Sequence, residues 1–158
     1  MSGRFQRITP FLWFDSQAEE AANYYVSIFP NSRVLSLTRY TKESATASGQ
    51  PEGAVMTASF ELDGCPVTAL NGGPLFQFSV AISLVVHCQD QAEIDHYWEK
   101  LSAGGDPNAQ ACGWLKDKYG LSWQIVPADI ETLVRSPGAV AALMQMKKID
   151  IAAMKAAA

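Results

Sequence analysis

Two helix starts of the same composition constrain this chain most, because they indicate an internal repeat. One start is Ser-Gln-Ala-Glu at residues 16–19, and the other is Asp-Gln-Ala-Glu at residues 90–93. In each, the side chain of Ser16 or Asp90 can accept a hydrogen bond from the backbone amide three residues on, while the glutamate can reach back. Each start is therefore predicted to form a capping box at the beginning of a helix.

The segments around these two starts follow the same order of elements. Apolar residues behind each start recur at the spacing of one helical face, which predicts two amphipathic helices. They are Ala22, Tyr25, Val26 and Phe29 in the first helix, and Ile94, Tyr97, Trp98 and Leu101 in the second. Apolar, strand-like segments precede the helices at 8–14 and 80–88, and further strands are predicted at 33–40, 55–62, 67–70, 111–115 and 121–126.

This order predicts an α+β fold, with residues 1–158 forming one domain. It would contain two βαβββ modules, at 5–75 and 78–128, and a C-terminal helical extension at 129–158. Between two strands of the first module, the dipeptide Asp63-Gly64 predicts a tight hairpin.

Two segments lie outside the repeat. Residues 41–53 are rich in Ser, Thr, Ala and Gly, and are predicted to form a mobile loop. Apolar residues within 139–155 predict a C-terminal helix with one apolar side to spare, which could dock on a partner subunit.

Charge and composition exclude several classes of protein. The formal net charge is −4 and the pI is about 5.1, so a nucleic-acid-binding surface is not expected. No apolar run is long enough to cross a membrane. The cysteines Cys65, Cys88 and Cys112 are odd in number and form no CxxC motif, which is typical of reduced thiols in a cytoplasmic protein.

Four stretches resemble one protein family, and together they extend over nearly the whole chain. They are residues 8–14, 70–74, 146–151 and above all 112–127, which reads CGWLKDKYGLSWQIVP. These stretches are similar to the PhnB-like branch of the vicinal oxygen chelate (glyoxalase/bleomycin-resistance) superfamily, whose family label is 3-demethylubiquinone-9 3-methyltransferase. The resemblance implies that the two modules form a curved, cup-like mixed sheet, and that the protein is a homodimer.

The resemblance also implies where a metal would bind in metal-dependent members, which use His and Glu from four strands. Those positions hold Thr9, Ser83 and Gln124 here, and the fourth lies within 68–71, where the inward-facing residue is not fixed. Hydroxyls and amides are poor ligands for transition metals. We therefore predict no metal and no cofactor.

The predicted ligand site combines these polar residues with aromatic ones. Trp13, Trp114 and Trp123 lie on or beside predicted strands and could stack on a flat ligand, although residues of this kind more often belong to the core. Asn71, in the loop Asn-Gly-Gly-Pro, is predicted to be a further ligand contact. His87 could act as a general base or be an ordinary strand-end histidine.

We expect metal-independent binding or conversion of a small organic metabolite, with no assigned reaction. One alternative is a methyltransferase acting on a quinone-like substrate, as the family label says. Another is a resistance protein that sequesters a drug. The methyltransferase alternative is weakened because no glycine-rich loop opens a helix, as a Rossmann-type S-adenosylmethionine site would require.

Overall fold

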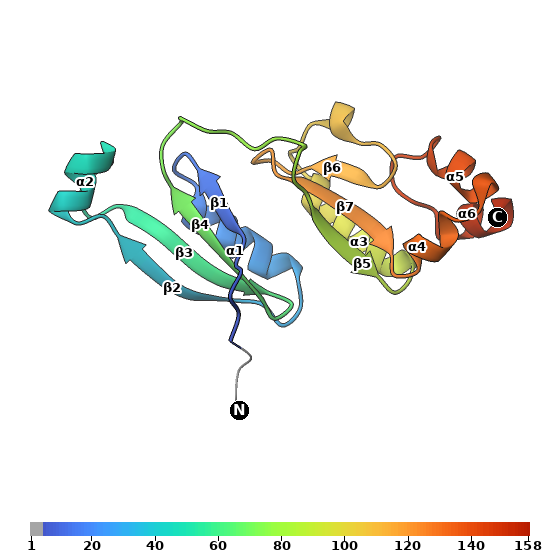
Figure 1. Ribbon diagram of the computed structural model, residues 1–158, viewed down its shortest axis with the longest axis horizontal. Helices are drawn as coiled ribbons and strands as arrows, with labels where there is room; N and C mark the ends of the chain where they lie inside the picture. The colour runs from blue at the N-terminus through green and yellow to red at the C-terminus, as the bar shows by residue number, and fades with distance from the viewer. Residues whose placement is uncertain (1–4) are drawn as a thin grey trace. The chain divides into compact units, whose positions relative to one another are not determined.

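The computed structural model describes residues 5–158, which divide between Gln77 and Phe78 into two compact units (Figure 1). Each unit contains one β-sheet and is described by itself. No helix among the described residues is both long and apolar enough to span a bilayer.

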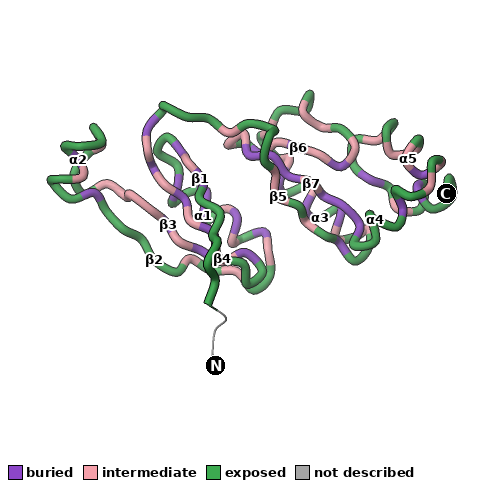
Figure 2. The backbone as a smooth tube through the Cα atoms, in the orientation of Figure 1, coloured by how far each residue is buried: buried purple, intermediate pink, exposed green. Residues whose placement is uncertain are grey.

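In the first unit, helix α1 lies against one face of a four-stranded sheet (Figure 1). The strand order is β1-β4-β3-β2, with β1 parallel to β4 and the other neighbours antiparallel. Buried and less buried residues alternate along β3 and β4, as expected for a sheet with one covered face (Figure 2). The elements are β1 (Phe11–Phe14), α1 (Ala18–Ile28), β2 (Arg33–Arg39), α2 (Lys42–Ser48), β3 (Val55–Leu62) and β4 (Cys65–Asn71).

The predicted hairpin between β3 and β4 is confirmed. Asp63 and Gly64 have φ angles of 46° and 76°, so both central residues adopt the left-handed conformation that a type I′ turn requires. This turn fixes the register of the strands that precede and follow it.

The segment 41–53 was predicted to be a loop, and this is wrong for most of its length, because helix α2 occupies residues 42–48. The Thr41 side chain accepts a hydrogen bond from the Ser44 N–H, and the Ser44 hydroxyl accepts one from the Thr41 N–H, which completes a capping box. Gly49 ends the helix in the left-handed conformation, with φ of 73°. The capping residues of a short helix, Thr41 and Ser44 at its start and Gly49 at its end, therefore occur within a segment whose composition is typical of loops.

In the second unit, a three-stranded sheet carries helix α3 and has the strand order β5-β7-β6. The strands β5 and β7 are parallel, as β1 and β4 are in the first unit. The strands β6 and β7 are antiparallel, as β3 and β4 are. The α+β fold class is confirmed, as two sheets of four and three strands, although the second module has one strand fewer than a full βαβββ unit. Its elements are β5 (Leu84–Cys88), α3 (Gln91–Ser102), the 3₁₀-helix η1 (Pro107–Ala109), β6 (Trp114–Lys116) and β7 (Ser122–Pro127).

The two repeated helices are capped in different ways. At α3, the Asp90 carboxylate accepts from the Glu93 N–H (2.9 Å), while the Glu93 carboxylate accepts from the backbone of the residue before Asp90. At α1, the box predicted for Ser16 does not form. The side-chain oxygen of Asn71, at the end of β4, accepts from the Ala18 N–H instead (2.7 Å).

Strand β6 begins later than predicted, at Trp114 rather than at residue 111. Cys112 and Gly113 have φ angles of 53° and 85° and form a tight left-handed turn. Ala111 and Trp114, which flank this turn, exchange two backbone hydrogen bonds of 3.1 and 2.8 Å.

The C-terminal extension is helical, but the single helix predicted over 139–155 is wrong. The chain leaves the helical conformation after α5 because its backbone pairs with the turn before β6. The N–H groups of Cys112 and Gly113 donate to the carbonyls of Met146 and Lys147, at 2.8 Å each. The end of the chain therefore packs on its own unit through α4 (Ile130–Leu133), α5 (Pro137–Leu143) and α6 (Ile151–Ala157).

Candidate functional site

Each sheet has one face covered by its helix and an opposite face, which we call the outer face. In the second unit, Trp123 and Ile125 lie on the α3 side and are at most 2% exposed. Side chains alternate along a strand and register partners share a face. Gln124 therefore lies on the outer face together with its partners Trp114 on β6 and Val85 on β5.

Two of the predicted ligand residues meet on this outer face. The side-chain amide of Gln124 donates to the Ser83 hydroxyl (3.0 Å), and both residues are half-buried. The resemblance places metal ligands at these two positions, but a hydroxyl and a carboxamide do not fit a divalent transition metal. Within residues 5–158, no three His, Cys, Asp or Glu side chains gather in a way that could hold a metal ion.

Trp114 and Trp123 have different environments although both were predicted to contact a ligand. Trp114 is half-buried on the outer face, whereas Trp123 lies in the core. The indole N–H of Trp123 donates to the buried Asp117 carboxylate (2.9 Å), whose other oxygen accepts from the N–H groups of Tyr119 (2.9 Å) and Leu121 (3.1 Å). We therefore leave Trp123 out of the proposed site.

The outer face of the second unit contains three further polar residues, of which only His87 was singled out from the sequence. Lys116 and Ser122 are register partners on β6 and β7. The Ser122 side chain is buried, and its hydroxyl has no hydrogen-bond partner among the described residues. His87 is exposed near the end of β5, and a role as a general base remains a prediction.

In the first unit, the outer face combines aromatic and hydroxyl side chains. Trp13 and Leu70 are register partners, as are Phe11 and Thr68. The Trp13 indole N–H donates to the Gly73 carbonyl (2.9 Å), and its half-buried ring meets Phe76 edge-to-face with centroids 5.0 Å apart. The Trp13 ring is therefore fixed in place, and part of its flat apolar surface remains exposed.

The register also identifies the residue that the sequence left open within 68–71. Thr68 pairs with Phe11, three residues before the end of β1, just as Gln124 pairs with Val85, three residues before the end of β5. Thr68 is thus the counterpart of Gln124, and it offers a hydroxyl. Thr9 is exposed in the segment before β1.

Asn71 lies on the opposite side of its sheet, facing α1. In addition to capping Ala18, its amide nitrogen donates to the Val55 carbonyl (3.1 Å). Its own backbone carbonyl accepts from the Tyr40 hydroxyl (2.6 Å). These contacts give Asn71 a structural role, and we do not include it in the proposed site.

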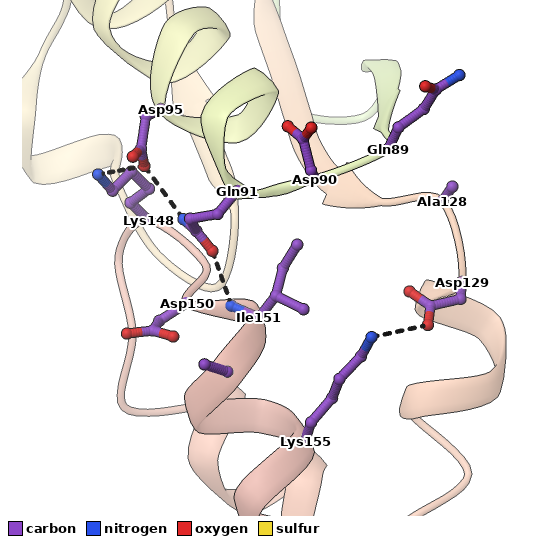
Figure 3. A pocket seen from close by; sticks show the side chains of 11 residues that line it. Gln89, Asp90, Gln91, Asp95, Ala128, Asp129, Lys148, Asp150, Ile151 and Lys155 are labelled. Carbon is purple, nitrogen blue, oxygen red and sulfur yellow. Dashed lines mark hydrogen bonds and ion pairs between the residues drawn. The ribbon is translucent and has the colours of Figure 1, made fainter.

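A groove of about 830 Å³ lies in the second unit between the start of α3, the end of β7 and α6 (Figure 3). Lys148 pairs with Asp95 (2.7 Å) and Lys155 with Asp129 (3.7 Å) across it. The hydrogen bonds from Lys148 and then from Gln91 lower the pKa of Asp95. These contacts attach the C-terminal segment to α3 and to the start of α4, so we assign the groove to packing within the unit.

Comparisons with known proteins agree with this fold. The model of the family described as 3-demethylubiquinone-9 3-methyltransferase matches residues 6–126. The chain is similar to the PhnB protein from Bacillus cereus, with 36% identity and a TM-score of 0.65, over 77% of this chain and 99% of that chain.

Two more distant structures share the fold alone. A protein from Pseudomonas aeruginosa has 18% identity and a TM-score of 0.58, over 78% of this chain and 98% of that chain. A genomically encoded fosfomycin resistance protein from Listeria monocytogenes has 13% identity and a TM-score of 0.51, over 84% of this chain and 97% of that chain. No curated protein matches the chain.

Proposed function

Because the chain belongs to the family labelled 3-demethylubiquinone-9 3-methyltransferase, a PhnB-like branch of the vicinal oxygen chelate superfamily, we propose that it binds or converts a small organic molecule without a metal. The hydrogen bond between Gln124 and Ser83 carries this proposal, because two positions expected to hold metal ligands instead form a neutral pair. Such groups suit a ligand carbonyl or hydroxyl.

The aromatic residues on the outer faces support a partly flat ligand. Trp114 is the register partner of Gln124, so an indole and an amide lie side by side on one face. In the first unit, taken by itself, Trp13 likewise places an indole on the outer face. Indole rings contribute large apolar contact areas at little cost in conformational entropy, which suits small aromatic or quinone-like molecules.

The methyl transfer named in the family label has less support. A Rossmann-type S-adenosylmethionine site needs glycines that open a helix directly after a strand. Here Gly72 and Gly73 follow β4, but Pro74 comes next and no helix begins before α3. The label is therefore treated as a family name, and methyl transfer as the second candidate.

Native mass spectrometry of the purified protein, together with elemental analysis, tests the proposal. We expect metal-free protein that carries a co-purified organic molecule or acquires one from a metabolite mixture. One tightly held transition metal per chain would contradict the proposal. Stoichiometric S-adenosylmethionine binding in a calorimeter would favour the methyltransferase instead.

A further inference from the structure

The Ser122 hydroxyl is buried without a partner. Its residue is 1% exposed, and no group among residues 5–158 hydrogen-bonds to its oxygen. Buried polar atoms in folded proteins are nearly always hydrogen-bonded, because leaving one unpaired costs free energy. The described residues therefore leave the hydrogen-bonding capacity of this hydroxyl unused.

Two other hydrogen-bonding side chains lie beside Ser122 on the outer face. Lys116 is its register partner on β6, and Gln124 is two residues further along β7. The Gln124 amide uses one hydrogen for Ser83 and keeps a second, because a carboxamide carries two N–H bonds. An ammonium, a hydroxyl and an amide N–H are thus available on adjacent strands.

The charge on this face is positive. No Asp or Glu occupies the strand positions of this face. These positions are 83, 85 and 87 on and before β5, 114 and 116 on β6, and 122, 124 and 126 on β7. Lys116 is half-buried and takes part in none of the ion pairs found among the described residues. A half-buried ammonium beside neutral donors favours an anionic group with several acceptor oxygens.

We propose that the outer face of the three-stranded sheet binds the carboxylate of a small aromatic acid. Lys116, Ser122 and Gln124 donate to the carboxylate, and the ring of the acid lies against Trp114, which is the register partner of Gln124. This inference rests on the proposed function and narrows its ligand class. A carboxylate satisfies the Ser122 hydroxyl and neutralises Lys116 at the same time, which a neutral ligand does not.

The test compares acids with their neutral amides on the full chain. Benzoate and phenylacetate, each paired with its amide, are titrated into ¹⁵N-labelled protein while the indole N–H signals are followed. We expect both acids to shift the Trp114 signal, assigned with Trp114→Phe, while the signal of Trp98 on helix α3 stays in place. The amides should bind at least about tenfold more weakly, since hydrogen bonds to charged groups are the stronger ones.

Variants then assign the effect to residues. Lys116→Gln should weaken binding of both acids by about tenfold to a hundredfold, and Lys116→Arg should retain most of it. Ser122→Ala should also weaken binding, with folding checked by its thermal transition. Lys118→Gln, in the turn of the same hairpin, is the matched control and should leave binding unchanged.

Equal binding of acids and amides would overturn the carboxylate assignment while leaving the proposed function intact. The assignment would also be overturned if Lys116→Gln bound the acids as tightly as the unaltered protein. Absence of any shift with all four compounds would overturn it as well, whereas the proposed function is decided separately by the co-purified molecule and the metal content.

Discussion

Trp13 owes its position to the absence of a side chain at Gly72. A β-carbon added at Gly72 would overlap three carbon atoms of the Trp13 indole. The indole N–H is held at the same loop by the Gly73 carbonyl (2.9 Å). The ring therefore lies directly on the backbone that follows β4, and this glycine determines where an aromatic surface of the first unit stands.

Substituting Gly72 by alanine should lower the free energy of unfolding by about 1–3 kcal/mol, because the ring or the backbone must move to make room. Urea denaturation followed by tryptophan fluorescence measures the change. The same substitution in a Trp13→Ala background should cost less, since the overlapping ring is gone. An equal cost in both backgrounds would show that the ring contact is not the cause.

Cys88 differs from Cys65 in its surroundings and therefore in its reactivity. Cys88 is fully buried at the end of β5, and burial, with smaller contributions from Glu93 and Asp90, raises its thiol pKa from 9.0 to about 12. Cys65 is exposed at the start of β4. Only thiolates react readily with disulfide reagents, so position and pKa both protect Cys88.

We expect a thiol reagent at pH 8 to modify Cys65 quickly and Cys88 only after unfolding. Between pH 9 and about 12 the unfolded chain loses the Cys88 proton while the folded chain keeps it, so this residue makes stability fall as pH rises. Denaturation at pH 8 and pH 10 measures the effect, and Cys88→Ala should show a smaller loss between them. Rapid labelling of Cys88 in folded protein would contradict this account.

At the scale of single elements, helix α1 depends on a distant residue for its cap. Asn71 reaches from the end of β4 to the Ala18 N–H, and its amide also holds the Val55 carbonyl. The side chain thereby connects α1, β3 and β4. Because Asn71 is only 8% exposed, removing its amide would leave these backbone groups without that partner in a buried environment.

Asn71→Ala should therefore destabilise the protein by about 1–3 kcal/mol. Ser16→Ala is the matched control, because Ser16 stands where the sequence predicts the cap but caps no residue of α1 in the structure. It should change stability by no more than a few tenths of a kcal/mol. Thermal unfolding of the two variants checks the pair, and a larger loss for Ser16→Ala would reverse the assignment.

Elements whose pattern is local could be predicted, and those fixed by distant contacts could not. The apolar periodicity placed α1 and α3, and Asp63-Gly64 specified its own turn. The Asn71 cap and the break between α5 and α6 depend on partners more than 30 residues away, which no local pattern contains.

The candidate site shows the same limit. The family resemblance selected Gln124, and the alternation of side chains along its strand would have predicted the opposite face, and hence the core, for its neighbour Trp123. Lys116 and Thr68 entered the site only through strand register. Register is set by how whole strands pair, so these two side chains could not be assigned from spacing in the sequence.

At the scale of the molecule, large apolar side chains remain exposed in two segments. Phe5, Ile8 and Phe11 in the first segment are 60–82% exposed, and Leu75, Phe76, Val80 and Ile82 in the second are 59–74% exposed. Single exposed apolar residues are ordinary, but monomers rarely expose them in such numbers within short segments. These two exposed apolar segments support the expected homodimer better than the C-terminal helices do, because α5 and α6 pack against each other within their own unit.

We therefore expect light scattering to give about twice the chain mass of 17.2 kDa at micromolar concentration. Replacing Ile8 and Leu75 by serine should shift the protein toward the monomer, because each change removes apolar surface that association would bury. Val134→Ser is the matched control, since Val134 is 41% exposed but lies outside both segments. A monomeric unaltered chain would mean that these segments are not an interface. The same would follow if the dimer survived the double substitution and dissociated with Val134→Ser.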